Sequence, residues 1–387
     1  MDELRLEARE FTDLTRWRWV LRDVAGKILA EHDVRLDASC WQFEAFTDLR
    51  RYTWWHAARE NRPADEARIV REVGVWTGAE VLGPVAPALL RRRPAVVRVV
   101  APEPLLSRPL GLAHADGKPL AAQEITLSFQ RDHDGAAPGK AAAGDRLRVL
   151  GLFSLPGSQP LGLRRERDAL AEAVPGARIL QYGVTRDRLR AVLAEGWDVV
   201  HVCGHGGPGG LLLETASGAP DPVSAADLAG LLDLTRDRVR LVTVFAAQPS
   251  AITVAEQRRR LGLPSPDHRA AGPPGADSAP GGALAARIAE RLGCAVLATR
   301  YPVSGEFAAA LTGALYPLLA GGLPLPQALG VTLKRLEAPS VFPALFPALS
   351  LAAPALFGDA AVTVTLPPGT PEPAGPVPAR MTGFPPR

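Results

Sequence analysis

Short apolar segments alternate with amphipathic ones between residues 147 and 298, and this alternation constrains the fold more than any other feature. The apolar segments predict strands at residues 147–153, 178–182, 199–203, 241–245 and 295–298. The segments between them predict helices at 163–173, 185–193, 225–232 and 281–292. Strands that are apolar at both odd and even positions are typical of a parallel sheet covered by helices on both faces. We therefore expect an α/β fold.

The N-terminal part of the chain has a different pattern. Residues 3–35 alternate apolar and polar side chains, which predicts two strands and a turn at residues 25–27 into a third. Further expected elements are a helix at 40–55, a helix with Pro and Gly interruptions at 69–90, strands at 96–100 and 125–129, a polar connector at 131–143 and a mobile surface loop at 263–282. Most tryptophans precede residue 80, which fits either a packed core or an exposed docking patch.

Composition and charge are those of an ordinary globular protein. The chain has 387 residues, 47% of them hydrophobic and 22% charged, so a sizeable core is expected. A net charge of +3 is small, and nucleic acid is not the expected partner. We find neither a secretory signal nor an apolar run of the roughly 18 residues that a membrane span needs. Three scattered cysteines fit a reducing compartment, so we expect a cytoplasmic protein.

Two of the predicted strands end in small residues that suit a functional site. The segment WDVVHVCGHGGPGG, residues 197–210, ends its strand in Gly-His-Gly, and RLVTVFAAQPS, residues 240–250, ends in Ala246 and Ala247. In open parallel sheets, functional groups gather beyond the carboxyl ends of the strands. One predicted helix separates the two segments. We therefore expect neighbouring strands, with His205 and Ala247 at the same edge of the sheet.

Several residues near these strand ends allow more than one interpretation. His201, Cys203 and His205 share one strand parity, so a metal site is conceivable, but no fourth ligand is evident. Burial within the strand is the better explanation of His201 and Cys203, and we expect Cys203 to be an inert thiol. The glycines of residues 204–210 do not form a phosphate loop, because the Gly-Lys-Ser/Thr ending is missing.

Acidic residues close to these segments in sequence are candidates for a substrate pocket. Asp198, Glu214, Asp221 or Asp227 could line a pocket that binds a basic substrate side chain. Each is alternatively a helix cap or a solvated surface acid. For the pocket we retain Asp198, Glu214 and Asp227.

Five groups of residues, taken in order, resemble the CHAT-domain family of caspase-like peptidases. They span about residues 145–320 and read RLRVLGLFSLP with LRRERDAL, ILQYGVTRDRLRAVL, DVVHVCGHGGPGGLLLE, VRLVTVFAAQPSA, and CAVLATRYPVSGEFAAALTGALY. The resemblance implies a caspase-like, mainly parallel sheet flanked by helices. It would occupy residues 61–366, with a small β-rich module at 1–60 before it and a Pro-rich tail at 367–387 after it.

The resemblance also implies a chemistry, that of a bacterial cysteine endopeptidase acting on a protein substrate. His205 would be the general base, residue 247 the nucleophile, and the backbone N–H groups of Gly206 and residue 247 the oxyanion hole. That chemistry requires no metal or organic cofactor. The family further suggests a role in stress, cell death or anti-phage defence and an activating protein partner, without direct contact with nucleic acid or membrane.

The expected cysteine is missing, because Ala247 stands at the nucleophile position. One interpretation is a deliberate Cys→Ala replacement that stops self-cleavage or retains a substrate. The other is a natural pseudopeptidase that binds peptides or proteins through the same cleft. The single change to a small residue, with the histidine and the glycines intact, favours the first interpretation.

Overall fold

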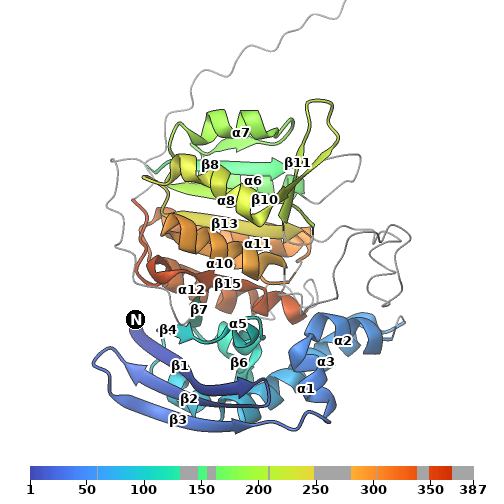
Figure 1. The fold of residues 1–387 in the computed structure, drawn as a ribbon, viewed down its shortest axis with the longest axis vertical. Coiled ribbons are helices and arrows are strands. Elements are labelled where there is room, and N and C mark those ends of the chain that lie inside the picture. Colours follow the sequence, from blue (N-terminus) through green and yellow to red (C-terminus); the bar gives the residue numbers. More distant parts are fainter. Residues whose placement is uncertain are drawn as a thin grey trace, which may run out of the picture.

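A mixed sheet of 13 strands runs through the computed structural model (Figure 1). The structure describes residues 1–58, 60–130, 147–154, 163–207, 210–247, 280–301, 303–337 and 348–367. The predicted α/β class is confirmed. The connector predicted at 131–143, residues 263–279 of the predicted loop and the predicted tail from residue 368 onward lie outside the described residues.

The strand order shows that the sheet is assembled from distant parts of the chain. From one side it runs β12 (Pro220–Ser224), β11 (Gly210–Glu214), β10 (Val199–Gly207), β13 (Leu241–Ala247), β14 (Ala295–Thr299), β15 (Pro354–Phe357), β7 (Ile125–Gln130), β4 (Ala95–Val100), β1 (Asp2–Asp13), β2 (Arg16–Asp23) and β3 (Ile28–Arg35). Two strands lie off this path, β8 (Val149–Ser154), which pairs with β10, and β9 (Arg178–Leu180), which pairs with β8. The strands predicted between residues 147 and 298 are all present.

The sheet contains two parallel blocks that run in opposite directions, with antiparallel strands at its ends. One block contains β9, β8, β10, β13 and β14. The other contains β15, β7, β4 and β1. They meet where β14 and β15 pair antiparallel. The short β15 was not predicted as a strand, because its four residues lie in an apolar stretch interrupted by prolines.

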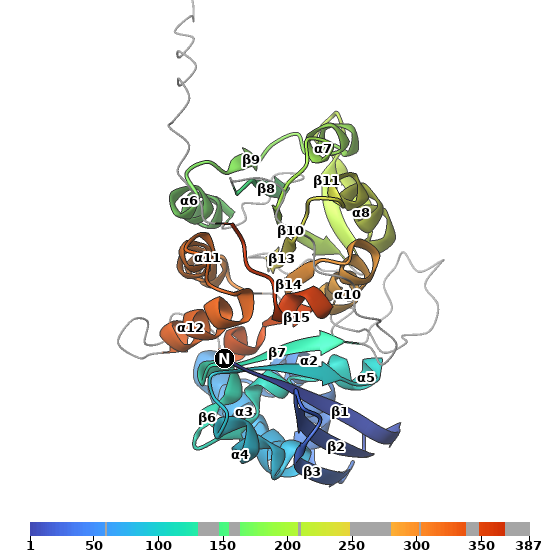
Figure 2. The ribbon, with the colours of Figure 1, turned by 90° about the vertical axis from the view of Figure 1, so that its left-hand side faces the viewer.

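Helices cover both faces of the first block, as Figure 2 shows. One face carries α6 (Leu163–Ala173) and α11 (Gly305–Ala320), and the other carries α7 (Arg186–Leu193), α8 (Ala225–Leu232) and α10 (Pro280–Leu292). Next to α11, α12 (Leu325–Glu337) packs on β7 and β4 of the second block. Strand parity separates the two cores. Odd positions such as Val199 and Leu241 belong to the buried cluster of α6, α11 and α12, whereas even positions such as Val200 and Val242 belong to the cluster of α7, α8 and α10.

The first three strands extend this sheet and do not form a separate one. β1 pairs in parallel with β4, and β2 and β3 follow as an antiparallel meander. The predicted turn between β2 and β3 uses Gly26, whose φ of +81° favours glycine. Trp17 and Trp19 are buried, so they belong to a packed N-terminal core, whereas Trp55 is half exposed.

The predicted helical stretch at residues 69–90 is interrupted, as its Pro and Gly residues predict. The helical elements of this region are α1 (Trp41–Thr47), α2 (Leu49–His56), α3 (Arg62–Trp76), a π-helical turn (Thr77–Leu82), α4 (Val85–Leu90) and, after β4, α5 (Glu103–Leu106). The break before α4 falls at Gly83, where φ is +50° and a Cβ atom would lie 2.7 Å from the His32 ring. Among the described residues, no helix is both long and apolar enough to cross a membrane.

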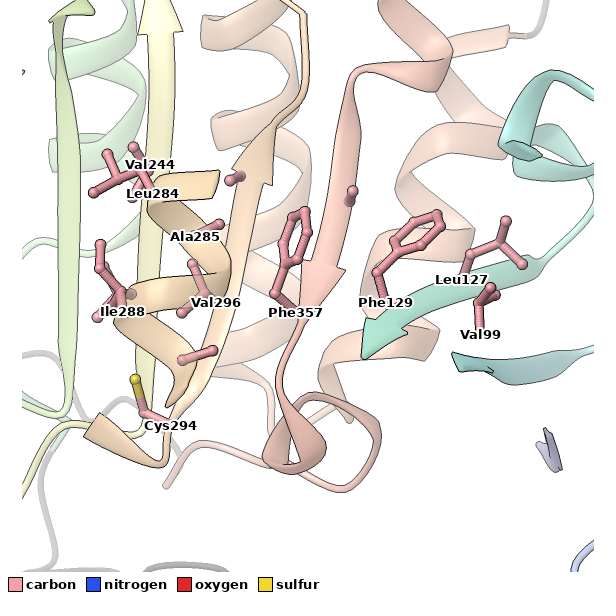
Figure 3. Packing of buried hydrophobic residues seen from close by; sticks show 14 of the residues in the cluster. Val99, Leu127, Phe129, Val244, Leu284, Ala285, Ile288, Cys294, Val296 and Phe357 are labelled. Carbon is pink, nitrogen blue, oxygen red and sulfur yellow. The ribbon is translucent and has the colours of Figure 1, made fainter. Parts of the chain in front are cut away.

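Two aromatic side chains of the second block pack beside its junction with the first block, where Phe357 pairs with Val296 of β14. Phe357 of β15 and Phe129 of β7 lie side by side, with ring centroids 6.0 Å apart (Figure 3). Both belong to the same buried cluster as Val296 of β14 and Ile288 of α10. The packing is therefore continuous across the point where the strand direction reverses.

We predict that Phe357→Ala lowers the free energy of unfolding by about 3–5 kcal/mol, because it leaves a cavity at this junction. Urea unfolding followed by circular dichroism measures the change. The matched control is Leu234→Ala, since Leu234 is 47% exposed and its loss should change stability by less than about 0.5 kcal/mol. Equal effects of the two substitutions would contradict the role given to Phe357.

Candidate active site

Strands β10 and β13 bring the two predicted catalytic positions together. They run parallel, in a register that starts with Val199 opposite Leu241 and ends with His205 opposite Ala247. Neighbouring strands lie about 4.8 Å apart, so the backbones at positions 205 and 247 face each other at about that spacing. The predicted adjacency of the two strands is confirmed.

Position 205 lies where the pairing of β10 changes partner. On its other side β10 pairs with β8, and this register ends with Gly204 opposite Ser154. Beyond it the chain turns back as β11, with Gly206 opposite Leu211. The Ser154 hydroxyl donates to the Leu212 carbonyl at 2.6 Å and joins the end of β8 to β11. His205 thus stands at the carboxyl edge of the sheet, between the last residue covered by β8 and the first covered by β11.

A buried polar network lies beneath this edge, on the face covered by α6 and α11. Glu166 of α6 is at its centre and is 0% exposed. Its Oε1 lies 3.0 Å from Nε2 of His201, and its Oε2 accepts a hydrogen bond of 2.8 Å from the Cys203 thiol. Two neighbouring odd positions of β10 therefore share one carboxylate.

The other nitrogen of His201 continues the network toward β13 and α11. Nδ1 lies 2.7 Å from the Thr243 hydroxyl and 3.0 Å from the Tyr316 hydroxyl, and these two hydroxyls are 3.1 Å apart. The rings of Phe153 and Phe245 enclose the imidazole at centroid distances of 5.5 Å and 5.2 Å. Two helices and two strands thus meet at one histidine.

Burial raises the pKa of two groups in this network, the Cys203 thiol and the Tyr316 hydroxyl. The pKa of the Cys203 thiol is raised well above its ordinary value, first by burial and then by the neighbouring Glu166 carboxylate. Burial also raises the pKa of Tyr316. The prediction that Cys203 is a buried thiol is confirmed, because the residue is 0% exposed. Within the part of the chain that the structure describes, no group of His, Cys, Asp and Glu side chains could hold a metal ion.

Two residues of this network, Glu166 and Thr243, could have been recognised in the sequence but were not among the predicted site residues. Glu166 occupies the same buried stripe of α6 as Leu163 and Leu170, where an apolar residue is expected. Thr243 is a polar residue in the middle of an apolar strand. An acid on an apolar helix stripe and a hydroxyl on a buried strand both indicate polar groups with buried partners.

Asp198 lies away from the predicted site. It directly precedes β10, at the amino edge of the sheet, whereas His205 is at the carboxyl edge. Its buried carboxylate accepts a hydrogen bond of 2.8 Å from the Arg148 backbone N–H and pairs with Arg238 at 2.9 Å. The pocket role predicted for Asp198 is therefore not retained, because this side chain anchors the start of β10.

Glu214 and Asp227 have partners of their own. Glu214, at the end of β11, is buried and accepts a hydrogen bond of 3.0 Å from the Gly183 backbone N–H. Asp227 is exposed in the first turn of α8, 3.9 Å from Arg186, where an acid suits the helix N-terminus. Arg186 also pairs with Asp221 at 2.7 Å and lowers the pKa of Asp221 through that hydrogen bond. Asp227 and Asp221 thus fit the surface-acid interpretation.

We predict that Cys203 resists alkylation in the folded protein. At pH 8, iodoacetamide should label the partly exposed Cys40, while Cys203 stays unmodified because its thiol is buried and its pKa is raised. Peptide mass spectrometry measures labelling at each cysteine. The same reaction in denaturant, where all cysteines react, is the control. Rapid labelling of Cys203 without denaturant would contradict its burial.

Comparison with known proteins identifies the family. The family model of the CHAT domain matches residues 92–341, which is more than half of the chain and contains both β10 and β13. A search of curated proteins finds no match. The resemblance seen in the ordered sequence segments is thus confirmed. The chain belongs to the CHAT-domain family, which is related to the caspase-like cysteine peptidases.

Proposed function

We propose that this protein has the active-site framework of a cysteine endopeptidase that cuts a protein substrate, with His205 as the base and residue 247 as the nucleophile position. The observation that carries the proposal is the register of His205 opposite Ala247 on adjacent parallel strands, at the carboxyl edge of the sheet. Membership of the CHAT-domain family supports it.

The chemistry follows from these positions once a cysteine occupies residue 247. The thiol would give its proton to the His205 imidazole, and the thiolate would attack the substrate carbonyl to form a tetrahedral intermediate. The N–H groups of Gly206 and residue 247 would stabilise the oxyanion. The imidazole would then return the proton to the leaving amine, and water would hydrolyse the thioester.

The chain with Ala247 has no thiol for this step. It retains His205 and Gly206, and binding does not require the covalent step, so it would hold a substrate without cutting it. The same observation favours a second candidate function, a pseudopeptidase that acts as a binding scaffold. The two candidates differ in whether a cysteine at position 247 restores activity.

The setting of this activity is part of the proposal. We place the protein in the bacterial cytoplasm, in a stress, cell-death or anti-phage defence pathway, with an activating protein partner and without direct contact with nucleic acid or membrane. The family match and the composition support this setting. Glu214 remains a candidate for the substrate pocket, because its buried carboxyl group lies on β11, which pairs with the end of β10, whereas Asp198 precedes the start of β10.

We predict that Ala247→Cys creates a thiol activated by His205. Iodoacetamide should modify the thiol at position 247 rapidly at pH 6, because the neighbouring imidazole keeps that thiol ionised. An unassisted thiol, with a pKa of about 8.5, is protonated at this pH. Adding His205→Ala should remove this low-pH reactivity, whereas His56→Ala, at an exposed histidine, should leave it unchanged. A reactivity that does not depend on His205 would refute the dyad.

We also predict that the Ala247 protein retains a substrate. Candidate proteins or a peptide library, supplied with candidate activating partners, are first screened for cleavage by the Ala247→Cys variant. Any substrate that this variant cuts, in a reaction abolished by alkylation, should bind the Ala247 protein intact in a pull-down. The scaffold candidate is supported instead if a partner binds but the Ala247→Cys variant, although alkylated in a His205-dependent manner, never cuts it.

A further inference from the structure

We infer that Glu166, His201, Thr243 and Tyr316 act as positioning residues that fix the register of β10 against β13, and thereby place position 205 opposite position 247. The inference rests on the proposed function. It extends that function to residues that do not touch the reacting atoms, since His201 precedes His205 by four positions, or roughly 13 Å of strand.

The apolar residues of the two strands cannot set this register alone. A slip of one residue would exchange the two faces and is excluded by the cores on both sides. A slip of two residues would keep every side chain on its face. On one face the slip would only exchange valines, at Val200, Val202, Val242 and Val244, so hydrophobic packing on that face distinguishes poorly between registers two residues apart. On the other face the slip would move His201 and Thr243 together with their apolar neighbours.

The polar network does distinguish these registers. Thr243 is the register partner of His201, and its hydroxyl lies 2.7 Å from Nδ1 of that histidine. A two-residue slip would place Thr243 opposite Val199 or Cys203 instead and would move His201 away from Thr243. Each buried polar atom left without a partner costs about 1–3 kcal/mol. The observed register is thus favoured by the polar contacts.

Helices α6 and α11 both bind the pair formed by His201 and Thr243. Glu166 lies in the first turn of α6 and binds His201 and Cys203 together, while Tyr316 of α11 binds His201 and Thr243. The α6 and α11 helices also pack against each other. A shift of either strand along its axis would therefore break contacts to both helices.

A glycine in β8 allows α6 to approach this closely. Gly151 is the register partner of His201 on the side away from Thr243. A Cβ atom at Gly151 would lie 2.9 Å from Leu170 Cδ2, which belongs to α6 one turn beyond Glu166. The missing side chain lets α6 lie against the sheet, where Glu166 reaches both His201 and Cys203.

Alkylation at position 247 tests the inference without knowledge of the substrate. In the Ala247→Cys protein, Thr243→Val removes only the hydroxyl that joins β13 to His201. The rate of iodoacetamide modification of position 247, followed by peptide mass spectrometry from pH 5 to 9, should fall by roughly 10- to 100-fold at pH 6, because small displacements of reacting groups cost that much. Thr243→Ser, which keeps the hydroxyl, should restore the parent profile.

The matched control is Thr312→Val on α11. The Thr312 hydroxyl is buried and has no hydrogen-bond partner among the described residues, so its loss should leave the pH profile unchanged. Circular dichroism and urea unfolding establish that each variant is folded. If Thr243→Val prevents folding, Tyr316→Phe replaces it, with the same expected loss of low-pH reactivity.

The results separate failure of this inference from failure of the proposed function. If the parent has His205-dependent reactivity and both Thr243→Val and Tyr316→Phe match it while folded, the positioning role is refuted and the dyad stands. If the parent has no His205-dependent reactivity, the proposed dyad fails and the inference fails with it. The inference is supported if Thr243→Val loses the reactivity of position 247 at pH 6, while Thr243→Ser and Thr312→Val keep the parent pH profile.

Discussion

The hydrogen-bonded pairing of β10 with β13 is the interaction on which the rest of the structure depends. These strands occupy the centre of the first parallel block, and helices bury both of their faces. Their backbone groups must bond to neighbouring strands, because an unpaired buried N–H or C=O is costly. The pairing of His205 with Ala247 is a direct result of this constraint. The sheet itself therefore places the two candidate positions opposite each other.

A reactive side chain can act at the edge of the sheet but not within the strand interiors. Within β10 and β13, apolar side chains alternate between two cores, and a reactive group there would be buried and inert. Cys203 illustrates this, since burial and Glu166 raise the pKa of its thiol. Position 205, two residues further along the same strand, is beyond the register with β8 and before the register with β11. The same strand thus carries an inert thiol and a candidate base.

The buried polar network opposes folding through lost hydration, but it specifies how the strands pair. An acid, a histidine and two hydroxyls without exposure lose their hydration, which opposes folding unless every group finds a partner. Each of Glu166, His201, Thr243 and Tyr316 has partners within 3.1 Å. Apolar side chains could fill the same space, but they would not specify one register among several. Specificity of strand pairing is the physical reason to place polar groups there.

Residue patterns alone determined the α/β class, the five parallel strands between residues 147 and 298, and the two strand ends that meet at the site. They could do so because apolar periodicity and helix caps are local. Thr185, for example, caps α7 by accepting a hydrogen bond from the Arg188 backbone N–H. The same local patterns indicated His205 as a candidate base, and the ordered segments identified the CHAT-domain family.

Tertiary structure decided the features that depend on distant residues. The joining of β1 to β4, and of β14 to β7 through the four residues of β15, brings together segments far apart in the chain, and no local pattern encodes such pairing. Asp198 is close to His205 in sequence, but an extended strand carries it to the opposite edge. Glu166 and Tyr316 are distant in sequence, yet helix packing brings both to His201. Periodicity gives the face on which a side chain lies, and only packing selects its partner.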